Sequence, residues 1–170
     1  MVLMKVKALI VFSPPAPAAL VLSPETNREG EETPGIYRVV PIWVGSPEAM
    51  SLKMALEGKR ANRPITHELF TEVLTVLDAR VEQVVIDEVE GKLFSAKLFL
   101  KQYDRELVID SRPSDAIALA LRQNAPIYML DDVLEQASFP YIVRNTMFEE
   151  EMIASFHDFL ETVAPDDFKG

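Results

Sequence analysis

Residues 110–129 read DSRPSDAIALALRQNAPIYM, and we take this stretch as the centre of the fold. Pro113 fixes a backbone φ that suits the first turn of a helix, and Asp115 places a carboxylate near the helix N-terminus, where the helix dipole favours negative charge. Residues 116–121 are apolar at six consecutive positions, which is typical of a helix buried on all sides. The sequence therefore predicts a core helix with a polar entrance.

The polar entrance of this helix has two interpretations. Acids and an arginine at one helix start are found in active sites, and they are also found in structural ion pairs. Residue types alone favour a well-capped core helix whose Arg112 pairs with a neighbouring carboxylate, with a catalytic cluster as the competing interpretation. The residues concerned are Asp110, Ser111, Arg112, Ser114 and Asp115.

Composition is that of an ordinary globular chain. With 170 residues, 48% of them hydrophobic and 26% charged, one domain can bury a sizeable core. The absence of cysteine excludes disulfides, thiolate zinc sites and cysteine nucleophiles, and two histidines are too few for a His-rich metal site. The apolar residues 2–12 contain two lysines, are too short to span a bilayer and lack a cleavage-site pattern. We therefore expect an N-terminal strand in a cytoplasmic protein with no membrane partner.

The net charge of −10 argues against a nucleic-acid partner, because phosphate binding depends on Lys and Arg. The charge is uneven, however. Residues 145–170 hold seven of the 27 acids and one of the 17 bases, so this segment carries −6 and residues 1–144 carry only −4. A local basic patch on the main body is compatible with these numbers.

Two runs of three predicted strands each lead into a helix. The first run comprises residues 2–12, 19–22 and 36–44, with a polar loop at 24–35. Ser46 is the predicted N-cap of the following helix, Pro47 its first residue and Gly58 its stop. A second helix follows with Thr66 as its cap, and its apolar residues recur at helical spacing: Leu69, Phe70, Val73, Leu74 and Leu77.

The second run leads into the central helix. Its strands are predicted at residues 81–89, 93–101 and 106–110. The pattern acid, Ala, apolar, small, Leu at residues 48–52 repeats at 115–119, an offset of 67, which indicates a duplicated β3α unit. A short strand at 127–130 and a short helix at 131–137 complete the predicted domain, residues 1–137.

Residues 138–170 are predicted to form an acidic C-terminal helical extension. The apolar side chains of this segment form a stripe at helical spacing opposite an acidic face. The stripe packs either on its own body or on another subunit. Because an exposed stripe and open sheet edges favour association, we expect a homo-oligomer, most simply a dimer. The stripe consists of Phe148, Met152, Phe156, Phe159, Leu160 and Val163.

Four motifs carry a resemblance to a known family. They are PIWVG at 41–45, EA at 48–49, RPITHEL at 63–69 and DSRPSDAIALALR at 110–122. Together they resemble the bifunctional nuclease family over about residues 1–137. The resemblance implies an α+β fold in which duplicated β3α units form a half-barrel-like, largely antiparallel sheet with helices packed on it. It also implies an activity on DNA and RNA. The chain departs from the family pattern at Glu68, where aspartate is usual, and in its large loop at 24–35.

The motif residues supply the groups that phosphodiester hydrolysis needs: a base, a positive clamp on phosphate and carboxylates for Mg²⁺. The predicted catalytic residues are His67, Glu68, Asp110 and Asp115. The predicted phosphate-binding residues are Arg63, Arg112 and Ser114. The predicted Mg²⁺ ligands are Asp110, Asp115 and Glu48, and no organic cofactor is indicated.

Three of these residues, and the neighbouring Thr66, also have a simpler explanation. Glu48, Thr66 and Asp115 suit capping and dipole roles, and His67 suits a helix start bonded to a backbone carbonyl. Two alternatives to a nuclease therefore stay open. One is a homo-oligomeric regulatory or ligand-binding module without enzymatic activity, and the other is a purely structural lock between helices and sheet. A cleft joining His67 to Asp115 favours the enzyme, whereas their burial in complete ion pairs favours the lock.

Overall fold

The computed structural model of the chain describes residues 1–12, 17–25 and 36–142. These residues form one open sheet of eight strands in the order β6-β5-β4-β7-β1-β2-β3-β8, with four helices packed on it. The strands are β1 (Val2–Ile10), β2 (Ala18–Pro24), β3 (Ile36–Val44), β4 (Ala79–Glu90), β5 (Leu93–Gln102), β6 (Arg105–Ser111), β7 (Ile127–Met129) and β8 (Phe139–Ile142). The helices are α1 (Ser46–Leu56), α2 (Thr66–Val76), α3 (Pro113–Gln123) and α4 (Asp131–Ala137).

The predicted α+β class with two β3α units is confirmed. Strands β1-β2-β3 form one antiparallel meander and lead into α1, while β4-β5-β6 form another and lead directly into α3; helix α2 is inserted between the two units, after α1 and before β4. The short strand β7 joins the two meanders, parallel to β4 and antiparallel to β1. The inner strands of the two halves are therefore antiparallel to each other, as a twofold relation requires. The two helix N-caps, Gly45 and Arg112, fall at the predicted offset.

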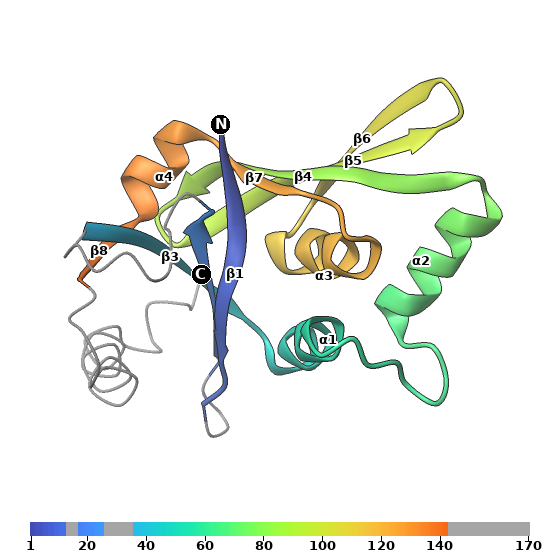
Figure 1. The fold of residues 1–170 in the computed structure, drawn as a ribbon, viewed down its shortest axis with the longest axis horizontal. Coiled ribbons are helices and arrows are strands. Elements are labelled where there is room, and N and C mark those ends of the chain that lie inside the picture. The colour runs from blue at the N-terminus through green and yellow to red at the C-terminus, as the bar shows by residue number, and fades with distance from the viewer. Residues whose placement is uncertain (13–16, 26–35, 143–170) are drawn as a thin grey trace.

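Helix α3 is the buried centre of the fold. It contacts α1, α2, β4 and β5, and Figure 1 shows it between α1 and α2, under the curved sheet. Residues 116–120 are all buried, and full burial of a side chain such as Ile117 contributes about 1.5–3 kcal/mol. The three alanines of this segment let the neighbouring elements approach closely. The helix begins after an extended residue, Arg112, and ends at Asn124 in the left-handed conformation.

Several predicted boundaries are wrong by a few residues. Ser46 and Thr66 were predicted as caps, but each is the first residue of its helix. Gly45 and Ile65 are the N-caps, because their carbonyl oxygens accept the first helical bonds, from Ala49 N (2.9 Å) and Leu69 N (2.8 Å). Strand β2 is longer than predicted and β1 is shorter. The sheet also continues past residue 137, because β8 pairs with β3.

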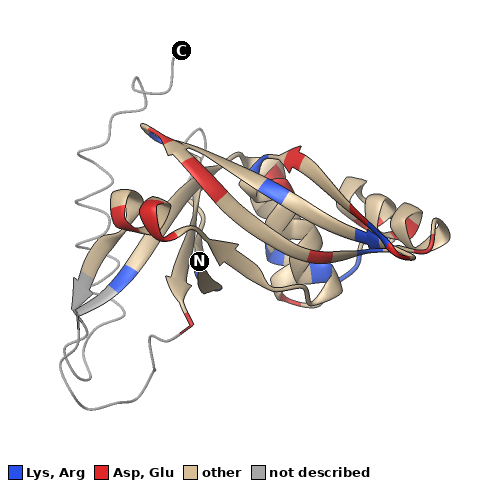
Figure 2. Ribbon diagram, turned by 90° about the horizontal axis from the view of Figure 1, so that it is seen from above, with Lys and Arg blue, Asp and Glu red and all other residues tan. Residues whose placement is uncertain are grey.

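Charge is distributed unevenly over the described residues (Figure 2). The short helix α4 carries three acids, Asp131, Asp132 and Glu135. Strand β5 carries Lys97 and Lys101, and each forms an ion pair with an acid of β6. The loop predicted at 24–35 lies outside the described residues beyond Glu25, and so does the whole C-terminal stripe. Among the residues that are described, no helix is long and apolar enough to cross a membrane.

Candidate functional site

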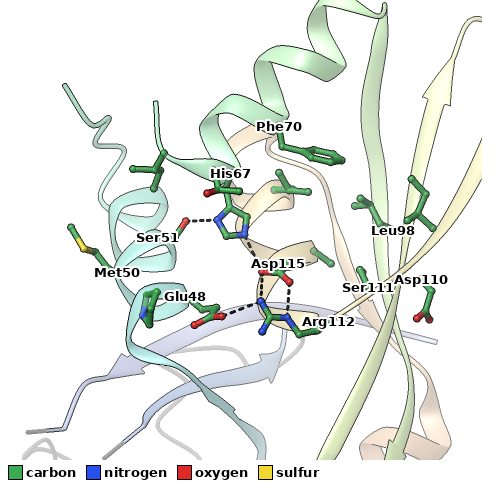
Figure 3. A pocket seen from close by; sticks show the side chains of 16 residues that line it. Glu48, Met50, Ser51, His67, Phe70, Leu98, Asp110, Ser111, Arg112 and Asp115 are labelled. Atoms are coloured by element: carbon green, nitrogen blue, oxygen red, sulfur yellow. Dashed lines mark hydrogen bonds and ion pairs between the residues drawn. The ribbon is translucent and has the colours of Figure 1, made fainter. Parts of the chain in front are cut away.

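A pocket of about 690 Å³ opens where the first turns of α1, α2 and α3 meet the end of β6 (Figure 3). The packing of α1 and α2 against α3 brings the three helix starts together. The polar residues that line the pocket are Glu48, Ser51, Thr66, His67, Asp110, Ser111, Arg112 and Asp115. Its apolar walls are formed by Pro47, Met50, Ile65, Phe70, Leu98, Ile109, Ala116 and Leu119.

Arg112 joins the two halves of the fold at the mouth of this pocket. Its Nε donates to Asp115 Oδ2 (2.8 Å) and its NH2 donates to Asp115 Oδ1 (3.2 Å). The same NH2 lies 3.0 Å from Glu48 Oε1. Glu48 and Asp115 are each the third residue of their helix, α1 and α3, so the two equivalent first-turn acids of the duplicated unit converge on one guanidinium. The Arg112 side chain is nevertheless 67% exposed, so it faces both the carboxylates and the solvent.

His67 links Asp115 to a second arginine. Its Nε2 lies 3.1 Å from Asp115 Oδ1, and its Nδ1 lies 2.8 Å from Ser51 Oγ. Arg122 NH2 donates to Ser51 Oγ (3.1 Å) and to the Ser51 carbonyl (3.0 Å). Because Arg122 can only donate, Ser51 Oγ accepts from it and has its own hydrogen available for His67 Nδ1. This pattern assigns the proton of the neutral ring to Nε2, facing Asp115.

The electrostatics of the cluster keep Asp115 ionised. Partial burial alone would raise the pKa of Asp115, but hydrogen bonds from Arg112 and His67 outweigh it and hold that pKa below its usual value. The hydrogen bond to Asp115, together with the Coulombic attraction, raises the pKa of Arg112. Burial lowers the pKa of Arg122, although a guanidinium remains charged at neutral pH. The cluster therefore presents a fixed carboxylate and an exposed cation side by side.

The structure brings only part of the predicted set together. Glu48, His67, Arg112 and Asp115 meet in one network, as described above. Glu68 turns away from the pocket, and its carboxylate accepts from Ile65 N (3.1 Å) and Ala61 N (3.2 Å), which caps α2 and holds the preceding loop. The remaining two predicted phosphate ligands do not line the pocket: Arg63 is exposed in the loop before α2, and Ser114 is only 7% exposed.

Asp110 lines the pocket but bonds elsewhere. It lies directly opposite Lys97 in the β5–β6 ladder, and the two side chains form an ion pair of 2.5 Å. Glu48 and Asp115 are already bridged by Arg112, so Mg²⁺ at the predicted position would have to displace a guanidinium. Within the described residues, no group of three or more His, Cys, Asp or Glu is placed to hold a metal ion. The arrangement therefore does not fit Mg²⁺ while Arg112 bridges the two acids.

Sequence reasoning missed Ser51 and Arg122. Ser51 is 4% exposed and contacts both His67 and Arg122. Arg122 also donates through NH1 to the Ala118 carbonyl (2.8 Å), which fixes it against α3. Arg122 ends the motif at 110–122, and Ser51 is the small residue of the repeated pattern, so both were within recognised motifs. Their contact spans 71 residues, and no local pattern reports such a pairing.

Comparison with known proteins finds one matching family model and two similar proteins. A family model described as the bifunctional nuclease domain matches residues 31–141. Two uncharacterised proteins, from two strains of Mycobacterium tuberculosis, are each 34% identical to this chain over 138 residues. Each match covers 78% of this chain and 82% of the mycobacterial protein. The matched region contains α1, α2 and α3, and hence the whole Glu48–Arg112–Asp115–His67 cluster.

Proposed function

Since the chain belongs to the bifunctional nuclease domain family, we propose that it hydrolyses phosphodiester bonds in DNA, RNA or both. The observation that carries the proposal is the guanidinium of Arg112, which two first-turn carboxylates share at the mouth of a pocket. A planar guanidinium binds a phosphate in bidentate fashion, and ion pairs with acids orient it before the substrate arrives.

The proposed reaction uses Arg112 as a mobile clamp. A phosphate at the pocket mouth competes with Glu48 for the NH2 group of Arg112, while Nε keeps its bond to Asp115. The guanidinium then stabilises the charge that develops on the phosphate oxygens as a water attacks phosphorus. Glu48, released from Arg112, accepts a proton from that water and returns it to the sugar oxygen as the phosphorus–oxygen bond breaks. No step in this scheme requires a metal ion.

His67 has a positioning role in this scheme. Both of its ring nitrogens are occupied, by Ser51 and by Asp115, so neither is directed at a substrate water. The imidazole instead holds the Asp115 carboxylate in the plane that Arg112 needs. We therefore assign the base to Glu48, in place of the His67 predicted from the sequence. The scheme predicts that His67→Ala weakens the cluster without removing the base or the clamp.

The experiment is cleavage of end-labelled single-stranded DNA and RNA by the purified protein, in magnesium and in EDTA. The variants are Arg112→Lys and Glu48→Gln, with Glu106→Gln as a matched control. Glu106 is exposed on β6 and pairs with Lys101, away from the pocket. We expect cleavage by the wild type and the control, and losses of about 100-fold or more in the two pocket variants. Equal cleavage by all four samples indicates a contaminating nuclease and contradicts the proposal.

A second function is favoured by the apolar walls of the pocket. Phe70, Leu98 and Ile109 suit a ligand with an apolar body, and Arg112 suits an anionic group on it. The chain would then be a homo-oligomeric regulatory or ligand-binding module without enzymatic activity. Absence of cleavage under all conditions, together with saturable binding of an anionic ligand that Arg112→Lys weakens, would support this alternative.

A further inference from the structure

Helix α2 leaves most of its apolar face uncovered. Within α2, which the structure describes in full, only Leu74 is buried. Leu74 lies on the side of the helix that faces α3 and β4. The other large apolar side chains are spaced three and four residues apart, so they form a stripe that begins beside Leu74 and extends around the helix. A continuous exposed face of this kind marks an interaction site. It comprises Leu69 (53% exposed), Phe70 (41%), Val73 (45%), Val76 (80%) and the C-cap Leu77 (53%), and we call it the α2 face.

Basic residues lie at both ends of the α2 face. Arg60 and Arg63 are exposed in the loop that leads into α2, and Arg80 is exposed just after it, at the start of β4. The acids of α2, Glu68 and Glu72, are not part of the apolar stripe, and the exposed Asp78, which lies between Leu77 and Arg80, accepts from the Tyr103 hydroxyl. A partner that complements this surface is an amphipathic segment with large apolar residues on one side and acids on the other.

This chain contains such a segment. Residues 148–163 lie outside the described part of the structure, and their sequence has a six-residue apolar stripe that begins at Phe148 and includes Phe156 and Phe159. Residues 145–170 carry seven acids and one base, the opposite sign to the arginines around the α2 face. We propose that the α2 face binds the C-terminal segment, residues 148–163, of a second copy of this chain.

The arrangement of the sheet favours the second copy over the same chain. Strand β8 ends at Ile142, and Figure 1 shows β8 and α2 at opposite ends of the molecule. The six residues from Ile142 to Phe148 reach at most about 22 Å when fully extended. Along the sheet, β8 lies five strand spacings from β4, a path of about 24 Å at the usual spacing, and α2 packs beyond them against β4 and α3. A reciprocal exchange of C-terminal segments therefore gives a closed dimer and covers both α2 faces.

The absence of cysteine in the chain makes a direct test possible. Val73→Cys places a single thiol in the middle of the α2 face, and Glu72→Cys places a matched thiol on the neighbouring exposed position outside it. The measurement is the rate of thiol alkylation in the full-length protein at micromolar concentration. A face covered for about nine-tenths of the time is alkylated about tenfold more slowly than a free one. We expect this protection at Val73→Cys and none at Glu72→Cys.

The paired variant Phe156→Asp/Phe159→Asp separates the outcomes. We expect this variant to lose the protection of Val73→Cys and to sediment as a monomer instead of a dimer. We expect the same two changes when the protein with its natural C-terminal sequence is diluted. Equal alkylation of both thiols with either C-terminal sequence would show that the α2 face is free and overturn the proposal. Protection that survives the paired substitution would assign the face to another surface of the second copy. Protection that is lost with the paired substitution but does not change on dilution would assign it to the same chain.

Discussion

Replacement of Asp115 with asparagine separates a chemical role of the cluster from a structural one. The Asp115 carboxylate accepts from Arg112 Nε (2.8 Å), Arg112 NH2 (3.2 Å) and His67 Nε2 (3.1 Å). An asparagine keeps the shape and one acceptor oxygen, but it turns the other oxygen into an NH₂ group that faces a donor. At least one charge-assisted hydrogen bond is therefore lost while the helix start is kept.

The size of the stability loss in Asp115→Asn depends on how exposed the Asp115 and Arg112 side chains are. Hydrogen bonds to charged groups contribute about 1.5–3 kcal/mol, whereas exposed ion pairs contribute about 0–1 kcal/mol. The Asp115 side chain is 32% exposed and that of Arg112 is 67% exposed, which places the pair between these limits. We expect Asp115→Asn to lower the free energy of unfolding by about 1–2 kcal/mol and Tm by about 3–6 °C.

The pH dependence of this difference has a definite sign. The pKa of Asp115 is lower in the folded protein than its ordinary value of 3.8. Its contribution to stability is therefore complete above that value and is lost as the pH falls through the lower folded pKa. The difference in unfolding free energy between the wild type and Asp115→Asn should therefore shrink as the pH falls below the ordinary value of 3.8. Denaturant unfolding at several pH values measures it.

The decisive quantity is activity per folded molecule, measured on the same samples as stability. If the proposed clamp operates, Asp115→Asn lowers specific activity by about 100-fold or more, because Arg112 loses the carboxylate that orients it. Glu106→Gln serves again as the control for a lost charge. A lower Tm with unchanged specific activity would refute the reasoning, and the DSRPSD segment would then be a lock that fixes α3 to the sheet.

Three further substitutions test the local geometry. Gly45→Ala should lower the free energy of unfolding by about 1 kcal/mol, because the added methyl would lie 2.5 Å from Glu48 Oε2 and force the Glu48 carboxylate away from Arg112. Thermal denaturation measures this loss, and an unchanged Tm would contradict the expectation. Ser51→Ala should cost about 1–3 kcal/mol and change the tautomer of His67, which nitrogen NMR detects; an unaltered spectrum would contradict the assigned proton. Asn124→Ala should cost about 1 kcal/mol at φ 53°, whereas Asn124→Gly should cost nothing, as chemical denaturation can check.

The sequence predicts correctly those features that depend on the residues of one helix or strand alone. The apolar run at residues 116–121 follows Pro113, which suits a first helical turn, and this combination indicates the buried helix. Glu48 and Asp115 fall at equal positions of two helices because both meanders end in the same way. The pairing of side chains was harder to predict. Asp110 was expected beside Asp115, but strand register places it opposite Lys97, and a shift of one residue would have turned it to the other face. Register and helix packing are non-local, so residue types alone could not choose between these partners.

The exposed face of α2 was hidden from sequence reasoning for a related reason. Leu69, Phe70 and Val73 recur at helical spacing, which indicates a helix but does not say what covers its apolar side. Phe70 connects the two proposals, because it belongs to the α2 face and also lines the pocket beside His67. A segment bound to the α2 face would therefore form part of the pocket wall, and the pocket would be complete only in the dimer. The paired Phe156→Asp/Phe159→Asp variant should therefore alter substrate affinity while leaving the Arg112 cluster intact. An unchanged KM in the monomeric variant would show that the pocket does not depend on the dimer.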